Sequence, residues 1–303
     1  MKLAKVPRPT GRKRSFWRYF LVKNLVFLAI AYVIGSFVLA EALLRGGEVS
    51  RGIERPRPER AEDVLIRTED GIDLSGWVLE PKAPARATVL LFHGIGDVRL
   101  GGWMPWLAEC GYRSIAVDHR GHGKSSGKRT TFGWDERRDV VAVARFGRER
   151  FPAEPIILWG VSMGGAAVAY AAREVGTAAA VIIESCYATI DEAYDNRLKL
   201  QAPEWLVFLG HGPRLAVEWR GGLERADLRP VDHVRGFTGD QLFVIAGGAD
   251  PLATPGESER IAGAVPGAAL WIVPKAEHAA CSGPNPAEYK SKVRAFFDRR
   301  TAR

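Results

Sequence analysis

Short apolar runs recur along the chain and alternate with stretches of helical periodicity. Most of these runs are continuous, as expected for strands of a parallel sheet that is covered on both faces. The runs are Ala87–Phe92, Ser114–Val117, Pro155–Trp159, Ala179–Ile183, Leu242–Ala246 and Leu270–Val273. The helical stretches are Trp103–Glu109, Trp134–Arg150, Gly164–Glu174, Gly256–Ala264 and Pro286–Arg300. This alternation predicts an α/β fold with a doubly wound, mostly parallel sheet.

Two regions depart from the alternation. Val64–Arg67 and Ile72–Leu79 flank the turn Glu69-Asp70-Gly71 and predict a β-hairpin. Residues 185–236 contain no predicted strand, yet they carry many aromatic and aliphatic side chains. A plain loop of that length would be unusual and more polar. We therefore expect a small helical cap over the functional site within a domain spanning residues 64–303.

An apolar segment lies near the N-terminus. Leu25–Ala40 carries no charge, and with its aromatic flank it approaches the ~20 residues that span a bilayer. Residues 1–24 carry basic and no acidic side chains, so this tail is expected in the cytosol. We expect residues 25–45 to be a single-pass signal anchor in the cell membrane, with the following domain extracytoplasmic. A cleaved signal peptide ending at Ala40-Glu41-Ala42 is the alternative, but the long basic region and the aromatic flank favour an anchor.

The net positive charge of the chain comes from the N-terminal tail, residues 1–24. The net charge is +8, but beyond residue 24 the basic and acidic side chains balance. This balance argues against a nucleic-acid partner. Residues 46–63, rich in Arg, Glu and Pro from Arg51 onward, predict a polar linker between anchor and domain.

The cysteines and histidines predict no metal site. Cys110, Cys186 and Cys281 have no C-x-x-C spacing, and His211 and His233 have no ligand partner at a useful spacing. An extracytoplasmic location would permit a disulfide between Cys186 and Cys281, although separate buried thiols are favoured. No cofactor is expected.

The segment Gly160-Val161-Ser162-Met163-Gly164 follows a predicted strand and precedes a predicted helix. In that context G-x-S-x-G indicates a nucleophile elbow, in which a sharp turn exposes the serine hydroxyl at the carboxyl end of the sheet. The turn forces Ser162 into strained backbone angles. Glycines on either side let the strand and the helix pass close together.

A serine nucleophile needs a base and an acid that orients the base. His278 is the histidine that follows the last predicted strand, and Asp250 follows the strand Leu242–Ala246. Both residues are expected at the same edge as Ser162, in the order Ser, Asp, His typical of one hydrolase fold. Glu184 also ends a strand at this edge and is the alternative acid, whereas Asp240 precedes its strand.

With His93-Gly94 and Asp118-His119-Arg120-Gly121-His122-Gly123-Lys124-Ser125, these residues resemble the α/β-hydrolase superfamily. The chain is most similar to the branch that contains monoglyceride lipases and serine aminopeptidase-like proteins, from about Val64 to the C-terminus. The resemblance implies that Ser162 attacks a carbonyl, that His278 transfers the proton and that Asp250 orients the imidazole. It also implies an oxyanion hole formed by the backbone N–H groups of Ile95 and Met163. His93, His119 and His122 are expected to shape loops.

The expected function is that of a membrane-anchored serine esterase, lipase-like, acting on a lipid or another hydrophobic ester. One alternative is a peptidase, which would grip an amine with acids such as Glu184, Asp191, Glu192 or Asp195. Another is a binding module that retains the fold without catalysis. The apolar cap segment Trp205–Leu209 has three interpretations: Trp205 and Phe208 bind substrate, the segment dips into the bilayer, or it packs on the core. The sequence predicts no oligomeric state.

Overall fold

The computed structural model describes residues 11–302, so residues 1–10 of the basic tail lie outside the described residues. Within that range an eight-stranded sheet has the order β1-β2-β4-β3-β5-β6-β7-β8. The β1–β2 and β2–β4 pairs are antiparallel and the remaining pairs are parallel, which confirms the predicted sheet. The strands are β1 Glu62–Arg67, β2 Asp73–Leu79, β3 Thr88–Phe92, β4 Arg113–Val117, β5 Ile156–Val161, β6 Ala180–Glu184, β7 Leu242–Gly247 and β8 Ala269–Val273.

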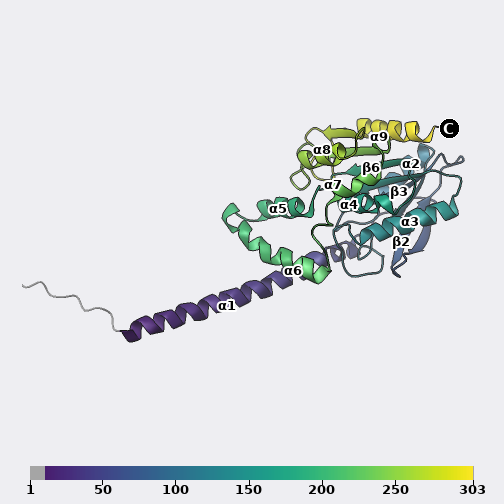
Figure 1. Ribbon diagram of the computed structural model, residues 1–303. Coiled ribbons are helices and arrows are strands. Elements are labelled where there is room, and N and C mark those ends of the chain that lie inside the picture. Colours follow the sequence, from purple (N-terminus) through teal and green to yellow (C-terminus); the bar gives the residue numbers. More distant parts are fainter. Residues whose placement is uncertain (1–10, 303) are drawn as a thin grey trace, which may run out of the picture.

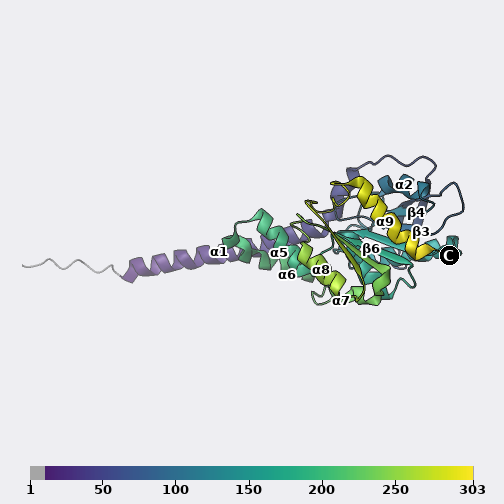
Figure 2. The same ribbon diagram turned by 90° about the horizontal axis from the view of Figure 1, so that it is seen from above.

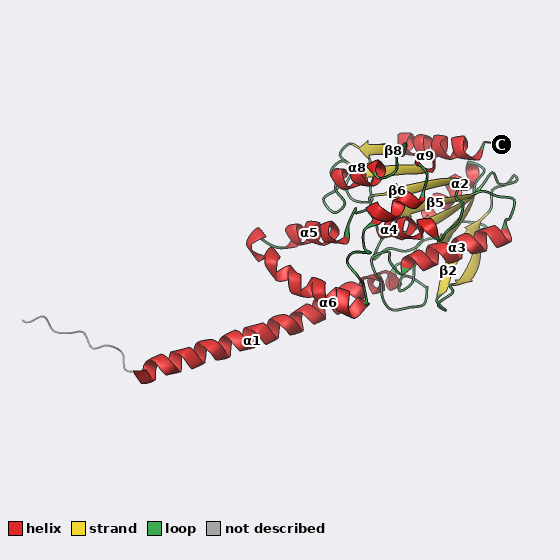
Figure 3. Ribbon diagram, in the orientation of Figure 1, coloured by secondary structure: helices red, strands yellow, loops and turns green. Residues whose placement is uncertain are grey.

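Helices cover both faces of the sheet (Figure 3). Successive strand residues point to opposite faces, so Leu90 and Leu158 enter one core while Leu91 and Trp159 enter the other. The first core is closed by α3 Glu136–Arg150, α4 Met163–Tyr170 and α8 Pro255–Gly263, and the second by α2 Met104–Glu109 and α9 Pro286–Thr301. Short 3₁₀-helices are η2 Gly101–Trp103, η3 Ala171–Arg173, η5 Val234–Gly236 and η6 Gly239–Gln241.

The segment between β6 and β7 is helical, as its composition suggested. It contains α5 Ile190–Gln201, the 3₁₀-helix η4 Glu204–Gly210, α6 His211–Gly221 and α7 Pro230–His233. Figures 1 and 2 show that α5 and α6 project from the body on the side from which α1 leaves it. At the end of α7, the His233 ring contacts the rings of Trp134 and Tyr170 in the body. The projecting cap, α5 to α6, is therefore shorter than the predicted 185–236.

Helix α1 (Gly11–Leu44) is longer than the predicted anchor and has two different halves. Residues 15–35 are exposed along their whole length, and the helix projects away from the body there (Figure 1). Ser36, Ala40 and Leu44, spaced four apart, are buried against the rest of the chain. They lie beside α6, where Gly212 contacts Ser36 and Gly221 contacts Leu44. The end of α1 is thus part of the domain core.

The predicted linker is partly wrong, because its first residues pack on the domain. Gly46–Gly52 forms the 3₁₀-helix η1, in which Gly47 and Ser50 are buried. The Ser50 hydroxyl accepts a hydrogen bond of 2.8 Å from the amide of Gly123. A Cβ atom on Gly47 would lie 2.7 Å from the His122 ring. The polar composition of residues 46–63 hides this contact, and β1 begins at Glu62.

Candidate active site

Ser162 occupies the sharp turn between β5 and α4. Its φ of 54° lies in the left-handed region, which is costly for a residue with a Cβ atom. A Cβ on Gly160 would lie 2.3 Å from the carbonyl oxygen of Gly164, and a Cβ on Gly164 would lie 2.4 Å from that of Phe92. Both glycines are therefore required by close backbone contact, as the G-x-S-x-G pattern predicted.

The structure brings Ser162, His278 and Asp250 together. The Ser162 Oγ lies 2.9 Å from Nε2 of His278. On the other side of the ring, Nδ1 lies 2.9 and 3.0 Å from the two carboxylate oxygens of Asp250. Because a carboxylate accepts, Nδ1 carries the proton, and Nε2 of the neutral ring is left to accept from the serine. This tautomer is the one that a general base requires.

Backbone hydrogen bonds hold the acid in place. Asp250 follows β7, and its Oδ1 accepts bonds of 2.9 Å from the amides of Leu252 and Ala253. The alternative acid, Glu184, is buried at the end of β6, where it accepts a hydrogen bond from the hydroxyl of Tyr289. Asp250, rather than Glu184, is therefore the carboxylate that contacts the imidazole.

Ile95 and Met163 belong to two short turns that lie next to Ser162. A Cβ on Gly94 would lie 3.2 Å from the Ser162 Cβ, so the turn after β3 passes beside the serine. In the described part of the chain, neither the Ile95 nor the Met163 backbone amide donates a hydrogen bond to a protein acceptor. Both residues also line the cavity over Ser162. Among the described residues, both amides are thus without a protein acceptor beside the Ser162 hydroxyl.

His93 holds the turn that carries Ile95. Its Nε2 accepts a 2.9 Å bond from the amide of His119, so Nδ1 bears the proton that is donated to the Gly94 carbonyl at 2.7 Å. Burial keeps the pKa of His93 well below its usual value and lowers that of His119 to about 3. Both rings remain neutral, in agreement with the predicted loop-shaping role.

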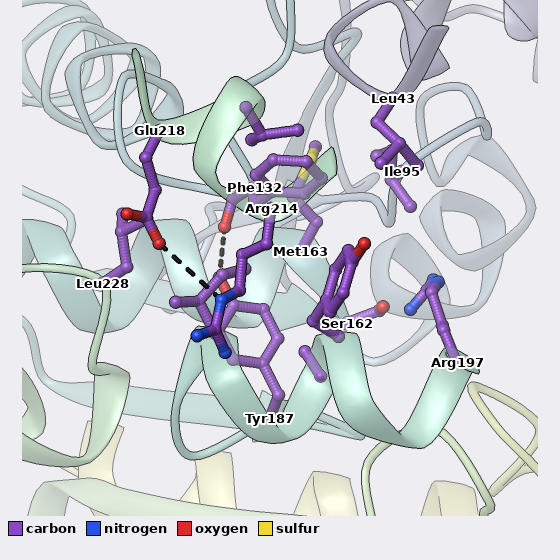
Figure 4. Close-up of a pocket in the computed structure, with 14 residues that line it drawn as sticks. Leu43, Ile95, Phe132, Ser162, Met163, Tyr187, Arg197, Arg214, Glu218 and Leu228 are labelled. Atoms are coloured by element: carbon purple, nitrogen blue, oxygen red, sulfur yellow. Dashed lines mark hydrogen bonds and ion pairs between the residues drawn. The ribbon is translucent and has the colours of Figure 1, made fainter. Parts of the chain in front are cut away.

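A cavity opens above Ser162 between the sheet, the cap and the end of α1 (Figure 4). Its volume is about 130 Å³. Its walls are mainly apolar, with a few polar groups. The lining residues are Leu43, Ile95, Phe132, Ser162, Met163, Tyr187, Ile190, Ala193, Tyr194, Arg197, Arg214, Val217, Glu218 and Leu228. Such a shape and lining are typical of sites for apolar small molecules.

Several of these residues were not predicted. Four of them have the spacing of one helix face: Ile190, Ala193, Tyr194 and Arg197. A helix predicted over residues 190–201 would have placed all four on the side that faces the site. Leu43 gave no signal, because it belongs to the apolar run of α1 and its packing against the body depends on tertiary structure.

Trp205 and Phe208 do not line the cavity, which corrects the prediction that they bind substrate. They lie in η4, where their side chains are 72% and 62% exposed. The cavity is bounded instead by the inner faces of α5 and α6. The chain reverses direction between these helices, so η4 is carried to the outer tip of the cap beside α1.

The three cysteines are free thiols, and the possible Cys186–Cys281 disulfide is absent. The Cys186 thiol donates to the Tyr187 carbonyl, and the Cys281 sulfur contacts the Ser185 hydroxyl. Within residues 11–302, no group of three or more His, Cys, Asp or Glu side chains is arranged to hold a metal ion.

Residues 83–226 match the family described as serine aminopeptidase, S33. The uncharacterized protein YqkD of Bacillus subtilis (strain 168) is 27% identical over 247 residues, 77% of this chain and 78% of that protein. The esterase Pf2001 of Pyrococcus furiosus superposes with a TM-score of 0.68 and 27% identity, over 82% of this chain and 96% of the esterase. XC6422 of Xanthomonas campestris, described as an a/b serine hydrolase without a lid, has a TM-score of 0.53 and 17% identity, over 81% and 97%. This last similarity concerns the fold alone.

Proposed function

Because this chain belongs to the α/β-hydrolase superfamily, we propose that it is a membrane-anchored serine hydrolase that cleaves carboxylic esters of apolar acyl groups. The observation that supports this most strongly is the continuous hydrogen-bonded series from Ser162 through His278 to Asp250. Hydrolases use this arrangement to raise the reactivity of an alcohol that is otherwise a weak nucleophile.

In the proposed reaction, the Ser162 oxygen attacks the ester carbonyl while its proton passes to Nε2 of His278. The carbonyl oxygen becomes an oxyanion that the amides of Ile95 and Met163 stabilise. Collapse of this intermediate breaks the bond to the alcohol, which leaves with the proton from His278. The acyl group stays bound to the Ser162 oxygen. Water then attacks the acyl group, its proton passes through His278 to the serine oxygen, and the free acid is released.

The lining of the cavity supports an apolar acyl group. Phe132, Met163, Val217 and Leu228 surround the space beyond the hydroxyl, together with Leu43 of α1. Each buried methylene of a bound chain would contribute about 0.8 kcal/mol. This gain would favour medium or long acyl chains over acetyl.

Helix α1 supports the membrane anchor. Among residues 11–302 it is long and apolar enough to cross a bilayer, over Ser15–Leu44 with a mean hydropathy of 2.2. Cleavage at Ala40-Glu41-Ala42 would remove the buried Ala40 and the ion pairs of Glu41 with Arg129 and Arg220. Since these contacts join α1 to the domain, a retained helix fits the structure better than a cleaved signal peptide.

The exposed side chains of the cap fit a bilayer surface. Trp205, Phe208, Leu209, Leu215 and Trp219 are exposed on η4 and α6. Trp219 lies beside the apolar part of α1, where its ring is 5.5 Å from the ring of Phe37. Exposed aromatic and aliphatic side chains in such number are costly in water and are typical of membrane contact. In this proposal the tip of the cap lies in the membrane–water interface, in the leaflet on the side of the domain.

The peptidase alternative finds less support in the site. Asp191 pairs with Arg214 at 2.9 Å, Glu192 pairs with Arg260, and Glu184 is bonded to Tyr289. Asp195 does not line the cavity. The acids that were expected to grip an amine are therefore either neutralised by partners or outside the site.

The test is labelling by a fluorophosphonate probe followed by turnover of p-nitrophenyl esters of graded chain length. The wild type should label and hydrolyse, whereas Ser162→Ala should not label and should lose at least about 10³-fold in kcat. Ser291→Ala, which changes an exposed serine of α9, should match the wild type. Lack of labelling in a folded wild-type chain would exclude the proposal and favour a binding module.

A further inference from the structure

Two arginines line the cavity, Arg197 and Arg214, and the proposed reaction uses neither of them. Arg197 lies in α5 on the same helix face as Ile190, Ala193 and Tyr194, and all of them line the cavity. Within residues 11–302 its guanidinium makes no hydrogen bond and no ion pair; Tyr187 and Asp250 act on it only through longer-range electrostatics. Burial lowers the pKa of the Arg197 guanidinium. Its nitrogen atoms are not buried away from the cavity, so this half-buried guanidinium, which has no protein partner among the described residues, can bind an anionic ligand.

The nearby acceptors are already occupied. The Asp250 carboxylate accepts from His278 and from the amides of Leu252 and Ala253. The Tyr187 hydroxyl donates to the carbonyl of Phe132, so its oxygen is left to accept from the Tyr170 hydroxyl at 3.4 Å. By contrast, the other arginine of the cavity, Arg214, is neutralised by Asp191 at 2.9 Å and by Glu218 at 4.0 Å. The unpaired charge of the cavity is therefore that of Arg197.

The position of Arg197 assigns it to one side of the reacting bond. Its neighbour Asn196 donates to the Leu252 carbonyl at 3.3 Å and to Glu257 at 3.0 Å, which ties this part of α5 to the loop that holds Asp250. Figure 4 shows the Arg197 side chain on one side of Ser162 and Glu218 and Leu228 on the other. His278 delivers its proton to the departing alcohol, so the side of Asp250 and His278 is that of the leaving group.

We infer that Arg197 binds an anionic group, a phosphate or a carboxylate, on the alcohol portion of the ester. This inference rests on the proposed function and narrows its substrate to acyl esters with an apolar acyl chain and an acidic leaving group. The guanidinium presents several N–H donors in a plane that matches either anion with two parallel hydrogen bonds. The apolar lining residues Phe132, Val217 and Leu228, beside the paired Arg214 and Glu218, accommodate the chain.

Binding is tested apart from catalysis in the full-length Ser162→Ala protein in neutral detergent. Calorimetry compares dodecyl phosphate, dodecanoate and dodecanol, with inorganic phosphate as a separate arm. The anionic amphiphiles should bind about 10- to 100-fold more tightly than dodecanol. The further change Arg197→Gln should abolish this difference, and Arg197→Lys should restore part of it. Lys199→Gln, which removes an exposed charge of the same helix, should leave the difference intact.

The outcomes separate the two proposals. Equal binding of the anionic and neutral amphiphiles, or an anion preference that survives Arg197→Gln, would overturn the role of Arg197 even where Ser162 labels and esters are cleaved. A preference that depends on Arg197 would support the role even where no ester is turned over. Equally tight binding of inorganic phosphate would show recognition of the free anion and overturn the assignment to an amphiphilic ester.

Kinetics give a second readout. An acyl glycerol phosphate and the acyl glycerol with the same chain are compared as substrates. The wild type should favour the phosphate by about tenfold or more in kcat/KM, chiefly through KM, and Arg197→Gln should reduce that ratio to near one. A ratio near one in an active wild type would contradict the inference.

Discussion

Tyr32 in α1 donates a hydrogen bond of 2.8 Å to the carbonyl oxygen of Leu209 in the cap. The same hydroxyl accepts a bond of 2.8 Å from the amide of Gly212 at the start of α6. One side chain of the apolar helix thus satisfies two backbone groups at the junction of η4 and α6. This contact makes the mobility of the cap depend on α1.

Tyr32→Phe should loosen this junction. Loss of the hydroxyl leaves the Leu209 carbonyl and the Gly212 amide without their partner, which should cost on the order of 1–2 kcal/mol in local stability. Hydrogen exchange of the Gly212 amide in detergent should accelerate accordingly. Tyr19→Phe, an exposed position of the same helix, should leave the exchange unchanged. Equal protection in both variants would contradict the link between α1 and the cap.

Truncation should separate the two halves of α1. A chain that begins at residue 31 keeps Ala40, Leu43 and Leu44 and should retain ester hydrolysis. A chain that begins at residue 46 loses the buried Ala40 and Leu44, and with them about 2–3 kcal/mol or more of unfolding free energy. It also lacks the cavity wall formed by Leu43. Urea unfolding and turnover of a long-chain ester measure both effects, and equal stability of the two chains would refute the packing role of α1.

Asp250→Asn should reduce kcat by about 10³- to 10⁴-fold, because an amide cannot hold the imidazole in the required tautomer. Substrate binding should change little, since the carboxylate is buried behind His278. The control is Asp240→Asn, at an exposed acid that pairs with Arg300 on the opposite edge. Steady-state kinetics of both variants suffice, and a normal kcat in Asp250→Asn would remove Asp250 from the proposed reaction.

Gly164→Ala should prevent the normal approach of α4 to β3. The added Cβ would lie 2.4 Å from the carbonyl oxygen of Phe92, a backbone atom that cannot move aside easily. We expect a loss of about 3 kcal/mol or more, or failure to fold. Gly256→Ala, with no atom within 4 Å of its Cβ, should be neutral or stabilise by up to about 1 kcal/mol. Thermal melts of the two variants compare these positions.

Acid should destabilise the protein through Asp118. Burial alone would raise the pKa of this carboxyl, but the Arg99 guanidinium and two backbone amides outweigh it and hold the pKa below the usual value. A lowered folded-state pKa means that the stabilisation is present above about pH 4 and is lost as the pH falls further. Asp118→Asn should lower the free energy of unfolding by about 3–5 kcal/mol at neutral pH. It should also make that free energy depend less on pH in the acid range. Urea midpoints between pH 3 and 7 test this, with the exposed Asp63→Asn as the control.

The sequence was sufficient to predict those elements and residues whose chemistry and local pattern agree. The strands were predictable because buried parallel strands are continuous apolar runs, and Ser162, Asp250 and His278 because each follows such a run. The roles of Leu43 and Arg197 were not, since both depend on how α1 and α5 pack over the sheet. Trp205 and Phe208 were misassigned for a related reason: apolar composition does not distinguish a pocket wall from an outer tip. The packed residues 46–52 were hidden by their polar neighbours.

The helix that carries the charge-free run continues without a break into the body of the domain. Leu43 follows Ala40, the last residue of that run, by three positions, a rise of about 4.5 Å along the helix. A continuous helix is a rigid connection. In an anchored protein it would fix the distance of Ser162 from the hydrocarbon core of the membrane. Lipids would then be selected by the depth of their ester linkage within the leaflet as well as by their chemistry, and encounter would reduce to a search in two dimensions.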